Sequence, residues 1–139
     1  MTEHNIDNLI GNTPIIKIKA QYKENIVNIY AKLEYFNYTG SIKDRLALYI
    51  IKDAKKNGIL KEGMPIIEAT SGNTGISFAS LGAYYNHPVH IFIPDTASIE
   101  RITISGNITV KTITIKATIL IVVFSYILGL YLQNEIMMV

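Results

Sequence analysis

The alternation of short β-like runs with a helical period, which continues up to Arg101, most constrains what this chain can fold into. Three runs have the apolar, Ile-rich composition that is typical of strands: residues 25–34, 64–70 and 89–93. Helical patterns begin at Ser41 and at Ile76, between these runs. The order strand, helix, strand, helix, strand predicts parallel pairing through right-handed crossovers, and therefore an α/β layer fold.

The first helix has the clearest pattern. We expect it to begin at Ser41, whose hydroxyl would cap the helix together with Asp44 three residues later, and to end in the basic, glycine-terminated segment 55–58. Its apolar residues recur on one face: Ile42, Leu46, Ala47, Ile50, Ile51 and Ala54. This face is predicted to be buried.

The composition excludes several classes of protein. A hydrophobic content of 49% and a charged content of 17% are typical of a folded chain and not of a disordered one. The net charge of +2 is spread along the chain, so we expect no nucleic-acid binding. The absence of cysteine excludes disulfides, thiolate metal sites and a thiol nucleophile. The N-terminus shows no secretory signal, and we expect a cytoplasmic location.

After Arg101 the pattern changes. Residues 102–116 alternate Ile or Val with Thr around a Ser-Gly-Asn turn, which in isolation is typical of a hairpin. Residues 117–134 contain no charged side chain. As a helix they would span about 27 Å, slightly less than the roughly 30 Å hydrocarbon core of a bilayer. Membrane insertion through this segment is therefore possible but less favoured than burial in a partner or an aggregation-prone tail.

Residues 70–75 (TSGNTG) form the clearest candidate binding loop. Hydroxyls, the Asn73 amide and backbone N–H groups at the start of a helix could enclose a carboxylate or a phosphate. The alternative is a well-capped connection between a strand and a helix, and a single glycine-rich turn more often has this structural role. Residues 11–14 (GNTP) are interpreted as a structural turn.

Lys43 is the candidate nucleophilic amine. It lies in the first turn of the predicted helix, where the positive end of the helix dipole disfavours an ammonium group. A neutral amine can form a Schiff base with pyridoxal phosphate. The alternative is an ordinary solvated lysine, and position alone does not separate the two. His4, His87 and His90 lack the spacing of metal ligands, so no metal site is predicted.

Four segments, taken in order, resemble the successive signatures of cysteine synthase, the O-acetylserine sulfhydrylase of the fold type II pyridoxal-phosphate enzymes: LIGNTPIIKI, AKLEYFNYTGSIKDR, EATSGNTGISFA and IPDTASIER. Four motifs in the right order are more specific than any one of them. The resemblance covers about residues 6–101. It implies an incomplete, tryptophan synthase β-like module with parallel strands and flanking helices in residues 1–101, followed by a divergent apolar tail in residues 102–139.

The resemblance also implies roles for single residues. Lys43 would bind pyridoxal 5′-phosphate as a Schiff base and later take the Cα proton of the substrate, while Asn73 would bond the cofactor's 3′ oxygen. The carboxylate of a small amino-acid substrate would be held by Thr70, Ser71, Gly72, Asn73 and Thr74. The reaction would be a β-replacement, in which acetate leaves O-acetylserine and sulfide adds to give cysteine. Members of the family are commonly homodimers.

The chain departs from the family pattern in ways that affect activity. Tyr38 and Thr39 replace a small Pro-Gly-like pair, and Ala69 replaces a proline. The later glycine-rich loop that holds the cofactor phosphate and a late serine that faces the pyridine nitrogen have no counterpart. We therefore expect little or no activity, and weak or no cofactor binding, from this chain alone. The abrupt change at residue 102 is what a frameshift or truncation would produce, and a genuine tail is the alternative.

Two further functions stay open at this point. The chain could be an inactive remnant or a binding fragment that docks onto an intact homologue through unpaired strands and its apolar tail. It could also be a small membrane-associated protein that is anchored by residues 117–134.

Overall fold

The computed structural model describes residues 5–70, 72–95 and 110–115. The described residues form two short 3-10 helices, η1 (Ile6–Leu9) and η2 (Glu34–Phe36), and two α-helices, α1 (Lys43–Lys56) and α2 (Asn73–Tyr84). They also form five strands: β1 (Ile15–Tyr22), β2 (Asn25–Lys32), β3 (Ile66–Ala69), β4 (Val89–Pro94) and β5 (Val110–Ile115). The strands belong to two separate sheets.

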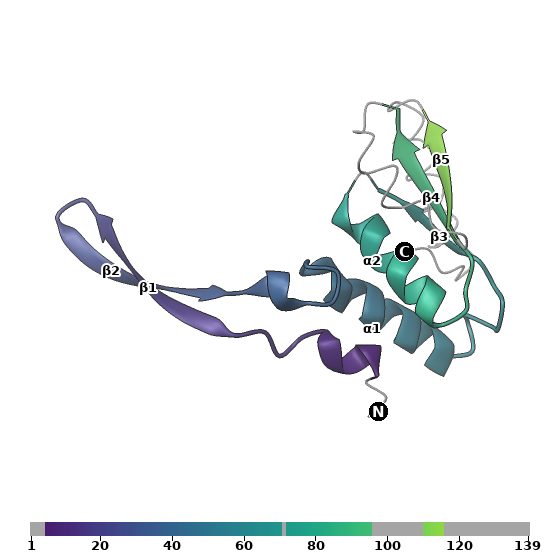
Figure 1. The fold of residues 1–139 in the computed structure, drawn as a ribbon, viewed down its shortest axis with the longest axis horizontal. Helices are drawn as coiled ribbons and strands as arrows, with labels where there is room; N and C mark the ends of the chain where they lie inside the picture. The colour runs from purple at the N-terminus through teal and green to yellow at the C-terminus, as the bar shows by residue number, and fades with distance from the viewer. Residues whose placement is uncertain (1–4, 71, 96–109, 116–139) are drawn as a thin grey trace.

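The larger sheet has the order β3-β4-β5, and both of its strand pairs are parallel. Its register aligns Ile66 with Val89 and Val89 with Val110. Helix α2 connects β3 to β4, as a parallel pair requires. Figure 1 shows this strand–helix–strand unit at one end of the molecule. The predicted α/β fold with parallel strands and flanking helices is confirmed.

Strand β5 extends the parallel sheet beyond the point where the sequence pattern changes. It pairs in parallel with β4, whereas the Ile and Thr alternation predicted that residues 102–116 fold as a hairpin. Alternation indicates a strand but does not specify its partner. The turn and first arm of that predicted hairpin, like the apolar segment 117–134, lie outside the described residues. None of the described helices has the length and apolarity needed to cross a membrane.

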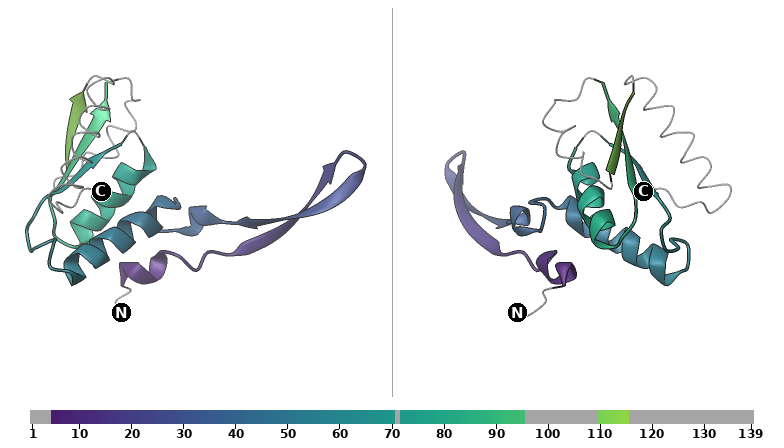
Figure 2. Two further views of the ribbon diagram at one scale, coloured as in Figure 1. Left: turned by 180° about the vertical axis from the view of Figure 1, so that it is seen from behind. Right: turned by 45° about the vertical axis from the view of Figure 1, so that its right-hand side comes forward.

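The prediction that residues 25–34 begin the parallel sheet is wrong. Strand β2 pairs antiparallel with β1, and the two form a sheet of their own. The two strands are joined by Lys23 and Glu24, and a two-residue connection allows only an antiparallel pair. Lys23 adopts a positive φ of 54° at this turn. Figures 1 and 2 show the hairpin as an arm that extends away from the rest of the molecule.

The hydrophobic core lies between the parallel sheet and the two α-helices. Helix α2 packs against β3 and β4, and α1 packs against α2. The core is built around the following buried side chains: Ala47, Ile51, Phe78, Leu81, Val89 and Ile91. The buried stripe of α1 is narrower than predicted, because Ile42 and Leu46 are exposed while Asp44 is buried.

Gly82 allows the close contact between α2 and β4. A Cβ atom at this position would overlap a methyl group of Val89 and would lie 3.2 Å from the carbonyl oxygen of His87. We predict that Gly82→Ala lowers the free energy of unfolding by about 1 to 3 kcal/mol, because the overlap outweighs the better helix propensity of alanine. Urea denaturation measures the change. Ala83→Gly, at an exposed neighbour, is the control for helix propensity, and a Gly82→Ala variant as stable as the wild type would contradict the prediction.

Candidate functional site

The start of α1 presents Lys43 at the surface. Lys43 is the first residue of the helix and is exposed, and its backbone N–H donates to the hydroxyl of Ser41 over 3.1 Å. The prediction that the helix begins at Ser41 with Ser41 as its N-cap is wrong, because Ile42 occupies the N-cap position and makes no side-chain cap bond, although the Ser41 hydroxyl still accepts the first N–H of α1. None of the ion pairs among the described residues uses the amine of Lys43. The amine is thus available for a ligand.

Asp44 joins the two α-helices instead of completing a capping box. It is fully buried, and its carboxylate accepts hydrogen bonds from the N–H of Thr39 at 2.6 Å, from the Thr39 hydroxyl, and from the hydroxyl of Ser77 at 2.6 Å. The chain can turn back in this way because Gly40 has a positive φ of 81°. Ser77 lies in the second turn of α2, so this carboxylate fixes the start of α1 beside the start of α2.

The start of α2 forms the second half of the candidate site. Strand β3 leads to Thr70, whose hydroxyl accepts the N–H of Gly72 over 3.3 Å, and α2 begins at Asn73 with no side-chain cap. Asn73 is exposed, while Thr70, Gly72 and Thr74 are half-buried. We call residues 70–74, which are predicted to hold the substrate carboxylate, the cradle. Ser71, the remaining residue of the cradle, lies outside the described residues. The uncapped N–H groups of α2 are suited to an anion.

Two glycines in this turn have different surroundings. A Cβ atom on Gly75 would lie 2.8 Å from a methyl group of Thr70 and 3.3 Å from Ile91, so Gly75 is needed for packing. A Cβ atom on Gly72 would meet none of the described atoms within 4 Å. As far as the described residues show, the space beside Gly72, at the uncapped start of α2, is open.

Glu34 connects two of the segments that carry the family resemblance, LIGNTPIIKI and AKLEYFNYTGSIKDR. Its carboxylate accepts two bonds from Arg45, at 2.7 and 3.1 Å, and one from the hydroxyl of Thr13 at 2.7 Å. Asn37 donates to the same carboxylate over 2.8 Å and accepts the N–H of Gly11 at 2.8 Å. These bonds, led by that from Arg45, lower the pKa of Glu34 to about 2. They hold the GNTP turn against α1, which supports its interpretation as structural.

Replacing Glu34 by glutamine is expected to destabilise the protein at neutral pH. Because folding lowers the pKa of Glu34 from 4.5 to about 2, its stabilising effect is present above pH 4.5 and is lost as the pH falls toward 2. Urea denaturation at pH 7 and at pH 3 should therefore show a larger difference between wild type and Glu34→Gln at pH 7. A difference of the same size at both values would contradict the role assigned to this carboxylate.

Glu68 is a buried acid on β3, next to the last residue of the strand. It is 6% exposed, and in the register of the sheet it lies beside Ile91, whose side chain lies next to Gly75 of α2. One carboxylate oxygen has no hydrogen-bond partner among the described residues. Burial raises the pKa of Glu68 to about 7. This acid therefore lies beneath α2, on the strand that leads into the cradle.

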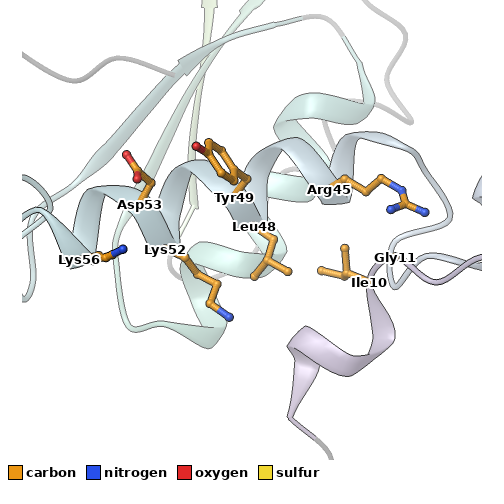
Figure 3. Close-up of a pocket in the computed structure, with 8 residues that line it drawn as sticks. All are labelled: Ile10, Gly11, Arg45, Leu48, Tyr49, Lys52, Asp53 and Lys56. Atoms are coloured by element: carbon orange, nitrogen blue, oxygen red, sulfur yellow. The ribbon is translucent and has the colours of Figure 1, made fainter.

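A groove along α1 is separate from Lys43 and from residues 70–74 (Figure 3). It has a volume of about 670 Å³ and is lined by Ile10, Gly11, Arg45, Leu48, Tyr49, Lys52, Asp53 and Lys56. Lys52 is paired with Asp7 at 2.6 Å, and Arg45 is paired with Glu34. Neither Lys43 nor the cradle lines the groove. Among the described residues no three His, Asp or Glu side chains gather as a metal site would require.

The sequence predicted Lys43 and the TSGNTG loop as site residues, and the structure places Lys43 and the described residues of the loop at the starts of two packed helices. It did not identify the contact between Asp44 and Ser77. These residues are 33 positions apart, and a buried acid bonded to a distant hydroxyl leaves no local pattern. The polar spacing of Ser41 and Asp44 instead suggested a cap.

Comparison with known proteins shows that this chain is similar to pyridoxal-phosphate dependent enzymes, and to cysteine synthases among them. The profile of the family described as "Pyridoxal-phosphate dependent enzyme" matches residues 6–115. A cysteine synthase of Aquifex aeolicus is 50% identical over 96 residues, which are 67% of this chain and 29% of that protein. A probable cysteine synthase of Bacillus subtilis is 46% identical over 98 residues, which are 70% of this chain and 32% of that protein.

Solved structures show the same similarity. A hydrogen sulfide-producing enzyme from Fusobacterium nucleatum superposes with a TM-score of 0.82 at 38% identity, covering 94% of this chain and 40% of the other. A cysteine synthase from Entamoeba histolytica gives a TM-score of 0.78 at 35% identity, covering 96% and 41% of the two chains. The chain thus spans about a third of the length of the curated relatives it matches.

Proposed function

The chain belongs to the pyridoxal-phosphate dependent enzyme family, and on that premise we propose that it carries the lysine and the substrate cradle of a cysteine synthase. The observation that carries the proposal is the bond between Asp44 and Ser77, which joins the helix that starts at Lys43 to the helix that starts at Asn73. A lysine and an anion-binding helix start on adjacent helices are what a Schiff-base site for an amino acid needs.

The residues present fit the aldehyde end of pyridoxal phosphate. Lys43 offers an exposed amine, and the start of α2 offers free N–H groups beside the open space at Gly72. When bound, the cofactor supplies an electron sink for charge that develops at the substrate Cα. The groups that would hold its phosphate belong to the part of the family's length that this chain does not match, so we propose weak cofactor binding by this chain alone.

The proposed roles follow from the chemistry of each group. Lys43 would hold the cofactor covalently and then move the proton at the substrate Cα. Thr70, Ser71, Gly72, Asn73 and Thr74 would hold the substrate carboxylate, because N–H groups and the helix dipole favour an anion there. Asn73 would in addition bond the 3′ oxygen of the cofactor. The substrate would be O-acetylserine, from which acetate leaves before sulfide adds.

Three parts of the proposal concern the chain as a whole. Residues 1–101 would be the family module, and residues 102–139 would be a divergent tail produced by a frameshift or truncation. Sequencing of the locus tests the origin of the tail. We expect a downstream reading frame that encodes the remaining family motifs. The chain alone would have little or no activity and would act in the cytoplasm. A homodimer, as is common in the family, is the proposed assembly.

The alternative functions have their own readouts. A binding fragment would associate with the rest of the family fold while showing no turnover. A membrane protein anchored by residues 117–134 would partition into vesicles and would lose that property when the segment is deleted.

Titration with pyridoxal phosphate, followed by visible absorbance, tests the proposed function. We expect a weak absorbance band that is present in the wild type and absent in Lys43→Ala, because the band requires a covalent bond between the amine and the cofactor. Lys56→Ala removes an exposed lysine from the other end of the same helix and is the matched control. A band of equal strength in Lys43→Ala would contradict the assignment of Lys43.

A further inference from the structure

Three polar side chains meet between the starts of α1 and α2. One carboxylate oxygen of the fully buried Asp44 accepts the hydroxyls of both Thr39 and Ser77, and the other oxygen accepts the N–H of Thr39. The two hydroxyl oxygens lie 3.4 Å apart. We call Thr39, Asp44 and Ser77 the interhelix polar cluster. Because both carboxylate oxygens have donors, the cluster holds its three side chains in one arrangement.

Neither helix start is held by a side chain at its own N-cap. Ile42 and Gly72 occupy these positions, and neither makes a side-chain cap bond. The hydroxyl of Ser41 accepts one N–H group of α1. Helix ends fray when their first N–H groups lack partners. Asp44 lies in the first turn of α1 and Ser77 in the second turn of α2, so the cluster holds the two starts by joining them to each other.

The position of the Lys43 amine depends on this cluster. Lys43 directly precedes Asp44 and is the first residue of α1. Its side chain is exposed and belongs to none of the ion pairs that the described part of the chain forms, so the backbone of the first turn sets where the amine lies. Asn73 begins α2, one helical turn before Ser77. A change in the cluster would therefore move the amine relative to the cradle.

A second polar contact joins the opposite ends of the same two helices. The carboxylate of Asp7 accepts the hydroxyl of Tyr85, the C-cap residue of α2, at 2.5 Å and pairs with Lys52 of α1 at 2.6 Å. Ile51 of α1 and Phe78 of α2 also lie in one shared core. Loss of the interhelix polar cluster would therefore release the helix starts while the helices stay packed.

We propose that Thr39 and Ser77 are positioning residues for Lys43. Their hydroxyls hold the carboxylate of Asp44, and Asp44 holds the first turn of α1 so that the amine of Lys43 stays directed at the cradle. Correct placement of a reacting group is a large part of its effectiveness, and neither hydroxyl needs to touch cofactor or substrate for this role. The inference rests on the proposed function, because it requires that Lys43 forms the Schiff base.

Titration of the full chain with pyridoxal phosphate tests the inference, with the apparent affinity taken from the absorbance that Lys43→Ala removes. We expect Ser77→Ala and Thr39→Val each to weaken this affinity about fivefold or more, because it falls with the fraction of molecules in which the start of α1 is held. Thr39→Ser keeps the hydroxyl and is expected to stay within about twofold of the wild type.

Two matched controls separate positioning from stability. Tyr85→Phe removes a hydroxyl that bonds a carboxylate at the far ends of the helices, and Ile51→Val removes one methyl group from the buried face of α1. Both are expected to lower the stability in urea and to leave the apparent affinity within about twofold of the wild type. Circular dichroism confirms that each variant folds, and if Ser77→Ala does not fold, Thr39→Val gives the measurement.

The outcomes distinguish the inference from the proposed function. A wild-type absorbance equal to that of Lys43→Ala would overturn the proposed function, and the inference with it. A wild type that binds through Lys43, together with unchanged affinities in Ser77→Ala and Thr39→Val, would overturn the inference alone. An equal loss of affinity in Tyr85→Phe would also overturn it, because the affinity would then follow the packing of the helices as a whole.

Discussion

Replacing Asp44 by alanine is expected to lower the free energy of unfolding by roughly 3 to 5 kcal/mol. The fully buried carboxylate accepts hydrogen bonds from the N–H of Thr39 and from the hydroxyls of Thr39 and Ser77. Alanine leaves these donors without their acceptor and also leaves a cavity where α1 meets α2. Urea denaturation gives the change in stability, and hydrogen exchange of the Thr39 amide reports the local effect.

Asp53→Ala is the matched control for this prediction. Asp53 lies on the same helix, is half-buried and accepts one exposed bond from Asn57 at 3.1 Å. Its loss is expected to cost less than about 1 kcal/mol. If Asp44→Ala does not fold, Asp44→Asn keeps the volume of the side chain and allows the measurement. Equal, small losses for Asp44→Asn and Asp53→Asn would show that Asp44 does not join the helices.

Replacing Glu68 by glutamine is expected to stabilise the protein above pH 7 by up to about 3 kcal/mol. Burial raises the pKa of Glu68 from 4.5 to about 7, so the folded state binds this proton more tightly than the unfolded state does. The stability of the wild type therefore falls as the pH rises from about 4.5 to about 7, and the loss is complete above that range. Glutamine has no charge to bury, so it avoids the loss.

The difference between the two proteins isolates Glu68 from the other acids, such as Glu34, whose effect on stability has the opposite sign. Urea denaturation should show nearly equal stabilities at pH 4 and a more stable Glu68→Gln at pH 8. Glu62→Gln, at an exposed acid, is the control and is expected to change little at either pH. A Glu68→Gln variant that is less stable than the wild type at pH 8 would show that the ionised carboxylate has a partner.

The parallel unit could be predicted from the sequence because its signals are local. The apolar runs around Ile66 and Val89 and the small, apolar helix between them specify a strand, a helix and a strand, and a crossover of this length requires a parallel pair. The partner of β2 could not be predicted in the same way. The sequence pattern of a strand does not indicate which strand it pairs with. The two-residue turn at Lys23 and Glu24 contains neither glycine nor asparagine, which are the usual signals of a hairpin.

The site was predictable to the extent that motifs identify a family. The order of the four motifs predicted the family membership that the match over residues 6–115 confirms. The physical support of the site was not predictable, because it depends on contacts between distant segments. Asp44 bonds Ser77, 33 positions away, and Glu68 is buried on a strand that contacts both α2 and β4. The roles of Lys43 and of the cradle residues stay predictions.

Reduction with borohydride in the presence of pyridoxal phosphate tests most directly whether Lys43 holds the cofactor. Reduction makes the bond between the amine and the cofactor permanent, and peptide mapping by mass spectrometry then identifies the lysine. We predict that the label is found on Lys43 in preference to the other exposed lysines, such as Lys52 and Lys56, and that adding the remaining part of the family fold increases it. A label spread evenly over the exposed lysines, or absent from Lys43, would contradict the prediction.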